Sequence, residues 1–132
     1  MKLVMLESPY AGDVETNIGF AQRCMYDCLT RGESPIASHL LYTQPNILDD
    51  NIAGHRDLGI KAGFAWARAC DYHVFYTDLG WSSGMLAALH MLLRIDRPFY
   101  LRGLNKGVIY PAALGEDVDR ILTRAASEEW QG

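Results

Sequence analysis

The chain alternates short apolar runs with longer segments whose apolar residues recur at helical spacing. Leu3–Leu6 is a continuous apolar run that stops at Glu7, a pattern typical of a strand buried on both faces of a parallel sheet. Pro35–Ala37, Tyr72–Thr77 and Pro98–Leu101 predict three further strands.

The segment between the first two strands predicts a helix that begins after Asp13, a residue suited to the N-cap, and is closed by Gly32. Its apolar positions recur every three or four residues: Val14, Ile18, Ala21, Met25, Cys28 and Leu29. This spacing places them on one helical face.

After the second strand we expect a long loop that contains His39, followed by a helix over residues 51–69 that Asp50 caps. Small residues on one side of this helix, Gly59 and Gly63 among them, allow close packing or ligand access.

The segment Ser83–Arg94 predicts a helix that is apolar nearly all round, and such a helix is buried. Beyond it we expect an edge strand at Gly107–Tyr110 and a last helix over Gly115–Glu129. Glu116 and Asp117 in the first turn of that helix suit its dipole.

Strands that alternate with helices predict one α/β domain over residues 1–132, with an open, doubly wound, mainly parallel sheet of Rossmann-like or flavodoxin-like type. The expected strand order is 2-1-3-4, extended by a fifth strand, with helices on both faces. Ligands of such sheets bind outside the carboxyl ends of the strands. Glu7–Asp13, the loop with His39, Asp78–Gly84 and the residues after Leu101 converge there.

Composition narrows the choice of partners. Lys and Arg total 12 against 16 Asp and Glu, a net charge of −4, which argues against a nucleic acid polymer but leaves room for a local phosphate pocket. No apolar span reaches the roughly 18 residues of a membrane helix, and the start is too short for a signal peptide. We therefore expect a protein of the cytoplasm with no membrane partner.

The sequence gives no signal for a metal or a cofactor, and we expect neither. The cysteines Cys24, Cys28 and Cys70 form no Cys-x-x-Cys pair, which fits a reducing compartment. Cys24 and Cys28 lie four residues apart on a predicted helix, where a metal could meet them, but small buried side chains are the simpler interpretation. Asp49 and Asp50 look like a metal-binding pair, but the neighbouring Pro45, Asn46 and Asn51 favour a loop that ends in a helix cap.

The stretch Trp81-Ser82-Ser83-Gly84 follows the third strand and opens a helix. Free backbone N–H groups and hydroxyls at a helix N-terminus attract phosphate or carboxylate. The alternative is structural: serine caps helices and glycine marks tight turns. Trp81 either forms a stacking wall at the pocket mouth or covers the helix.

Two carboxylates end strands at this edge of the sheet. Glu7 is the first candidate for nucleophile or general base, and Asp78 is the second. Glu7 has the alternative of reaching solvent or pairing with Arg56 or Arg102, and Asp78 that of stabilising a turn.

The first loop carries Tyr10, which can stack on a base or bond to a sugar, and Gly12, which lets a ligand approach the backbone. An ordinary turn with a packed ring is the alternative. Asp13 is foremost a helix cap, although a ligand contact is compatible with that role.

Taken in order, several short motifs resemble the nucleoside 2-deoxyribosyltransferase-like family, including its small bacterial and phage members. The resemblance spans roughly Lys2 to Leu101. The motifs that carry it are Ser8-Pro9-Tyr10-Ala11-Gly12-Asp13, Asn17, Pro35-Ile36-Ala37-Ser38-His39-Leu40, Arg56-x-x-Gly59 and Ser82-x-Gly84-Met85.

The resemblance implies cleavage or transfer at the N-glycosidic bond of a deoxynucleoside or its 5′-monophosphate. It adds Ser8 to the candidate substrate contacts, gives His39 a family counterpart that contacts a phosphate or base, and leaves Arg56 to hold the loop or neutralise a phosphate. It also implies a homo-oligomer, most simply a dimer, in the host cytoplasm if a phage encodes the chain.

One position departs from the family pattern. In the family's Ser-x-Gly-x-x-x-Glu motif, the nucleophilic glutamate falls on Ala88 of this chain. Two functions therefore stay open. The chain is an N-glycosidase or deoxyribosyltransferase acting on a small nucleotide, or it is an inactive nucleotide-binding module that senses or sequesters its ligand.

Overall fold

Parallel strand pairing organises the molecule. The computed structural model describes residues 1–104 and 107–112, the second range by its backbone alone. Its sheet has the order β2-β1-β3-β4-β5, in which the first four strands pair in parallel and β5 pairs antiparallel with β4. The predicted α/β class and the strand order 2-1-3-4 are confirmed.

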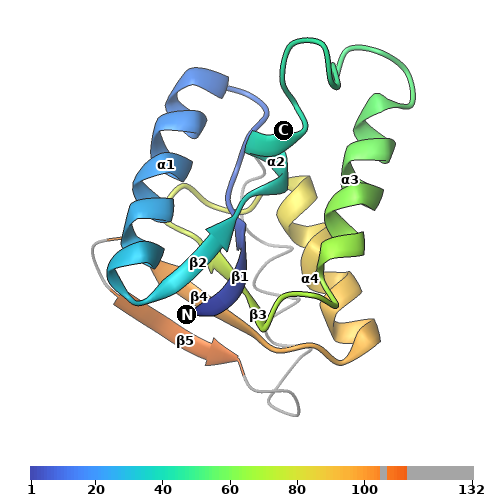
Figure 1. The fold of residues 1–132 in the computed structure, drawn as a ribbon. Helices are drawn as coiled ribbons and strands as arrows, with labels where there is room; N and C mark the ends of the chain where they lie inside the picture. Colours follow the sequence, from blue (N-terminus) through green and yellow to red (C-terminus); the bar gives the residue numbers. More distant parts are fainter. Residues whose placement is uncertain (105–106, 113–132) are drawn as a thin grey trace.

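The elements follow one another in the expected alternation (Figure 1). Their bounds are β1 Lys2–Glu7, α1 Val14–Thr30, β2 Glu33–Ile36, α2 Ser38–Leu41, α3 His55–Trp66, β3 Tyr72–Tyr76, α4 Ser83–Ile95, β4 Phe99–Gly103 and β5 Gly107–Ala112.

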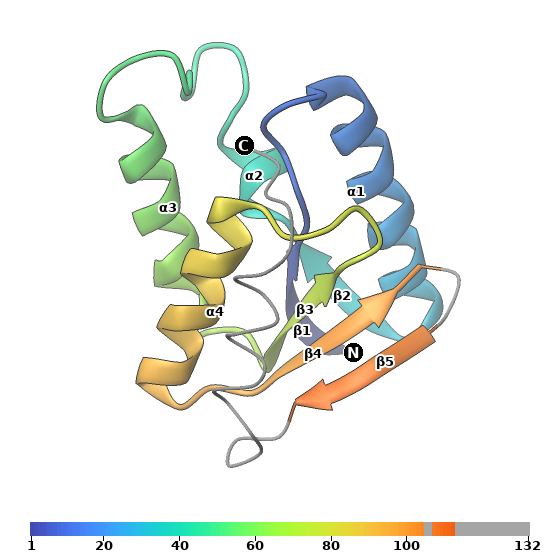
Figure 2. The same ribbon diagram turned by 180° about the vertical axis from the view of Figure 1, so that it is seen from behind.

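Helices cover both faces of the sheet, with α1 on one side and α3 and α4 on the other (Figures 1 and 2). Successive side chains of a strand point to opposite faces. Accordingly, Val74 and Tyr76 of β3 pack in the cluster with α1, whereas Phe75 packs in the cluster with α4. Both faces of the sheet are thus apolar, as the near-continuous apolar runs predicted.

Helix α1 begins and ends as predicted. The Asp13 side chain accepts a hydrogen bond from the backbone N–H of Thr16 at 3.3 Å and so caps the first turn. Gly32 follows the helix with φ +78°, a left-handed conformation that glycine adopts without strain.

Two expectations for the middle of the chain were wrong. His39 lies not in a loop but in the short helix α2. The next helix begins at His55 rather than at residue 51 and ends at Trp66. Gly54, with φ +85°, stands at its N-cap, while the Asp49 side chain bonds within the loop to the N–H of Asn51. The helix predicted over residues 115–129 lies outside the described residues.

Helix α4 is the buried helix that the sequence predicts. Ser82 caps it by accepting a hydrogen bond from the Met85 N–H at 3.1 Å. Five side chains of the helix are buried: Met85, Ala88, Leu89, Met91 and Leu92. The described part of the chain contains no helix long and apolar enough to cross a bilayer.

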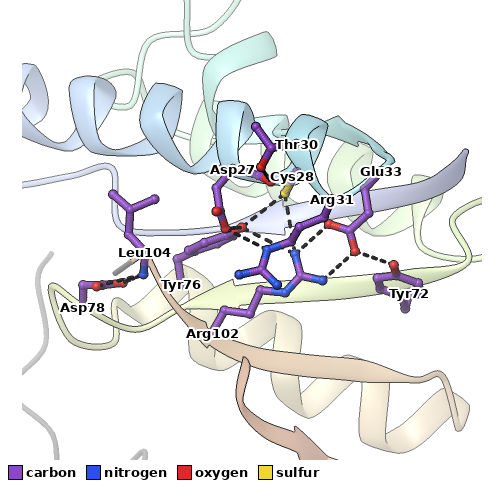
Figure 3. A network of polar contacts seen from close by, with 10 residues as sticks. All are labelled: Asp27, Cys28, Thr30, Arg31, Glu33, Tyr72, Tyr76, Asp78, Arg102 and Leu104. Atoms are coloured by element: carbon purple, nitrogen blue, oxygen red, sulfur yellow. Dashed lines mark hydrogen bonds and ion pairs between the residues drawn. The ribbon is translucent and has the colours of Figure 1, made fainter. Parts of the chain in front are cut away.

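A buried polar network joins β2, β3, β4 and α1 on the α1 face (Figure 3). Arg102 donates from Nη1 to Glu33 Oε1 at 2.6 Å and from Nη2 to Glu33 Oε2 at 2.5 Å. Tyr72 also donates to Glu33, and Tyr76 donates to Asp27 at 2.7 Å. This paired, bidentate geometry is what lets two charges lie in the core.

Removing the guanidinium of Arg102 tests how much the Arg102–Glu33 pair contributes to stability. Arg102→Met is expected to lower the free energy of unfolding by about 3–5 kcal/mol, because it leaves the Glu33 carboxylate buried without its partner. Arg31→Met is the matched control: Arg31 pairs at 3.0 Å with Asp27 near the surface, and its loss is expected to cost about 1 kcal/mol or less. Urea denaturation measures both, and equal losses would contradict a dominant buried pair.

The Arg102–Glu33 pair also determines how the stability of the fold changes with pH in the acid range. Burial alone raises the pKa of Glu33, but hydrogen bonds from Arg102 and Tyr72 outweigh it and hold the pKa below the ordinary 4.5. The stabilisation is therefore complete above pH 4.5 and is lost as the pH falls through the depressed pKa. As the pH is lowered through the acid range, the free energy of unfolding, measured by urea denaturation, should fall less for Arg102→Met than for the wild type.

Candidate functional site

A pocket of about 110 Å³ lies at the carboxyl ends of the parallel strands. Its walls come from the loop after β1, from α2, from one side of α3 and from the first turns of α4. These segments gather at the same end of the sheet in Figures 1 and 2. The site is therefore where parallel topology predicts one.

Most of the candidate site residues line this pocket. The structure brings together Glu7, Ser8, Tyr10, His39, Arg56, Ser82 and Gly84. They come from the end of β1 and the loop after it, from α2 and α3, and from the N-terminal end of α4 with its cap, so residues far apart in the sequence share one cavity.

The remaining candidates lie elsewhere. Both Asp78 oxygens accept from the backbone N–H of Leu104 at 3.0 Å, a contact drawn in Figure 3, so this carboxylate ties the β3 turn to the end of β4. Trp81 is only 4% exposed and packs against Phe75, with ring centroids 5.4 Å apart. It belongs to the core rather than to the pocket mouth.

Three further candidates support the site from its edge. Ser83 accepts a hydrogen bond from Arg56 Nη2 at 2.5 Å. Asp13 caps α1, and Gly12 lines a wider hollow beside the pocket. Gly12 has φ +96°, which lets the chain turn sharply into the helix.

The loop after β1 is held in place by Asn17. This buried side chain of α1 donates from Nδ2 to the carbonyls of Tyr10 at 2.9 Å and of Ala11 at 3.0 Å. Tyr10 in turn donates its hydroxyl proton to the Thr43 carbonyl at 3.3 Å. The pocket wall is thus fixed before a ligand arrives, as pre-formed sites are.

Ser8 and His39 form a polar pair in the wall. Ser8 Oγ lies 2.9 Å from His39 Nε2, and the Tyr10 ring meets the imidazole edge-on at 6.2 Å between centroids. Burial lowers the pKa of His39, although the charge of Glu7 opposes this effect. A neutral His39 offers a ligand one donor or one acceptor rather than a fixed charge.

The α4 N-terminus supplies the groups suited to an anion. Ser82 and Gly84 present the start of the helix to the pocket, and Arg56 approaches the same end through its bond to Ser83. Backbone N–H groups and a guanidinium together bind phosphate well.

Glu7 contributes a carboxylate to the same pocket. Its side chain is 14% exposed, and Oε1 lies 3.3 Å from Nδ1 of His73. The two arginines considered as partners for it are engaged elsewhere, since Arg102 pairs with Glu33 and Arg56 bonds to Ser83. Ala88 also lines the pocket and adds only a methyl group.

A wider hollow of about 740 Å³ adjoins the pocket beneath residues 43–55. The two cavities share Tyr10, Ala11, Thr43 and Asp50. A small deep pocket and a broad outer one together have room for a ligand of two parts.

The described residues hold no group of His, Cys, Asp or Glu placed to bind a metal ion. For Cys24 and Cys28, burial raises the pKa of each thiol, that of Cys28 to about 11. Both side chains are fully buried in the apolar cluster between α1 and the sheet, where they pack as small core residues.

The profile of a family described as a domain of unknown function (DUF7768) matches residues 2–101. The chain belongs to this family. The matched residues include every pocket-lining residue that the structure describes, from Glu7 to Ala88. None of the curated proteins matches the chain.

Sequence reasoning missed several residues that line the pocket in this DUF7768 domain: Ser38, Tyr42, Thr43, Asp50, Ile60 and Phe64. Most come from α2 and the adjoining loop, where no periodic pattern marks an element. The small residues of α3 were the available signal. Gly59 and Gly63 both line the pocket, four residues apart on one helical face.

Gly63 allows α2 and α3 to meet. A Cβ atom added there would lie 2.8 Å from Ser38 Oγ and 3.1 Å from Ser38 Cβ. Gly63→Ala is therefore expected to lower the free energy of unfolding by about 1–3 kcal/mol, because packed helices must separate. Thermal unfolding measures the loss.

Gly19→Ala in α1 is the matched control, since a Cβ atom there meets nothing within 4 Å. It is expected to stabilise the fold by roughly 0.5–1 kcal/mol through helix propensity. A Gly63→Ala variant as stable as Gly19→Ala would contradict the close contact.

Proposed function

We propose that this DUF7768 domain binds a small nucleotide or nucleoside and acts on its N-glycosidic bond, by hydrolysis or by transfer of the sugar. The observation that carries the proposal is the position of Glu7, whose carboxylate lines the same pocket as the α4 N-terminus and Arg56. A carboxylate and an anion-binding end in one cavity are the groups that cleavage of a phosphorylated nucleoside requires. The resemblance to nucleoside 2-deoxyribosyltransferase-like proteins supports the same chemistry.

Glu7 has two possible parts in the reaction. As general base, it removes a proton from a water molecule whose oxygen attacks the anomeric carbon; the C–N bond breaks, and the base leaves with the bonding electrons and takes up a proton. As nucleophile, the carboxylate attacks the same carbon while the C–N bond breaks and the nucleobase leaves with the bonding electrons and takes up a proton; water or a second nucleobase then attacks the glycosyl ester and releases the carboxylate. Both need an ionised Glu7.

The sizes of the cavities favour a ligand of two parts. The pocket of about 110 Å³ is small beside the roughly 300 Å³ at which ligand sites begin, so it holds a sugar or a phosphate rather than a whole nucleotide. The adjoining hollow of about 740 Å³ offers room for the rest. Tyr10, which lines both, can stack on a base at the junction.

Ala88 favours a second candidate function, that of a binding module without chemistry. It is 1% exposed and lines the pocket where the resembled family carries its nucleophile. A domain that kept the anion site and lost this glutamate would sense or sequester its ligand.

Cytoplasmic location and a dimer belong to the same proposal. The apolar surface of α4 packs within the chain itself. Leu58 and Trp66 on α3 remain 57% and 41% exposed, which supports a second copy covering this helix.

Base release separates the two candidates. A panel of ribo- and deoxynucleotides and their nucleosides is incubated with the protein, and mass spectrometry follows retained ligand and free base. The wild type is expected to release a base from at least one member, whereas Glu7→Gln abolishes release and preserves binding, because it keeps the size of the side chain and removes the charge. If the wild type only retains ligand and Ala88→Glu is needed for release, the binding module replaces the enzyme.

Arg56 is expected to recognise the phosphate. Arg56→Met should weaken the binding of a nucleoside monophosphate by about 1.5–3 kcal/mol and leave the binding of the matching nucleoside nearly unchanged. Only the monophosphate loses a charged hydrogen bond. Arg68→Met, which removes an exposed guanidinium that lines neither cavity, is the matched control. Isothermal titration calorimetry measures the affinities; an equal loss for both ligands would show that Arg56 only holds the loop.

A further inference from the structure

His73 is a buried histidine directly behind the site. It lies on β3 in register with Met5 of β1 and Phe99 of β4, and it is 1% exposed. The Phe75 ring stacks beside it on the same face, with centroids 6.4 Å apart. His73 itself does not line the pocket.

Core packing alone does not explain an imidazole at this position. Neither of its ring nitrogens makes a hydrogen bond to the residues that the structure describes. A buried polar atom without a partner costs about 1–3 kcal/mol, and an apolar side chain of similar size would avoid that loss. A histidine here therefore needs a reason outside the core.

The nearest charged group is the Glu7 carboxylate. His73 Nδ1 lies 3.3 Å from Glu7 Oε1, within ion-pair distance but not aligned as a hydrogen bond. Glu7 faces the pocket, so the imidazole contacts this carboxylate from the core side. The charge of Glu7 also acts on His39 of α2 and on Cys70, which precedes β3.

We propose that His73 is the positioning residue for Glu7. The neutral imidazole carries its proton on Nδ1, and a small rotation of either side chain aligns this N–H with Oε1. The donated hydrogen bond fixes the direction of the carboxylate, while the other oxygen stays free for the ligand. The pairing stands on geometry alone; its effect on turnover rests on the proposed function.

The pairing is tested first in the free protein. Long-range proton–nitrogen NMR of the imidazole rings reports which nitrogen is protonated. His73 is expected as the neutral Nδ1–H tautomer in the wild type and to move toward Nε2–H in Glu7→Leu, which removes the acceptor. A wild-type His73 that carries its proton on Nε2, or a tautomer that Glu7→Leu leaves unchanged, would overturn the pairing.

The effect on turnover is tested with two substitutions of His73. Asn places an amide N–H near the position of Nδ1, whereas Leu removes the donor. His73→Leu is expected to lower kcat for base release by about tenfold to a hundredfold with little change in KM, and His73→Asn to recover a large part of the loss. Phe99→Leu is the control for lost packing, since Phe99 is a buried neighbour on the same face that lacks a polar atom.

These results separate the two proposals. The expected tautomer without base release from any nucleotide supports the pairing and removes the enzymatic function. Base release in which His73→Leu, His73→Asn and Phe99→Leu all behave alike leaves the enzyme in place and overturns the positioning role.

Discussion

The parallel pairing of β1 with both of its neighbours is the constraint on which the site depends. Because β2 and β3 run in the same direction as β1, all three end at one edge of the sheet, and the chain must cross a face to begin each new strand. Glu7, the start of α2 and the N-terminus of α4 are thereby placed side by side. No local sequence pattern near Glu7 brings these three segments together; the common direction of the strands does.

Much of the fold could be predicted because both faces of the sheet are covered, so its strands appear as apolar runs. Helix α1 could be placed from Asp13 and Gly32, which act on their own local backbone. The start of α3 could not: a capping residue was available at Asp50, but the chain turns left-handed at Gly54 and the helix begins there. Several polar residues of this loop could cap the helix that follows it, and only tertiary contacts decide at which residue the helix begins.

The site was predictable only as far as strand ends specify it. Glu7 was found because a carboxylate closes an apolar strand, and the same logic selected Asp78, whose partner proved to be the Leu104 backbone. The sequence does not single out His73, because its contact with Glu7 follows from the register between β1 and β3. Register sets which side chains meet across a sheet, and an apolar run fixes it weakly at single-residue resolution.

Glu7 and Ala88 are best understood together, because they line one small pocket. Among the described residues, Glu7 and Asp50 are the acidic side chains that line this pocket, and the His73 imidazole lies beside Glu7 on the core side. Under the proposed function, the Glu7 carboxylate at the end of β1 takes the part that the resembled family gives to a glutamate at the position of Ala88. The tautomer of His73 tests its contact with Glu7 before any substrate is known, and base release then tests whether that carboxylate acts in catalysis.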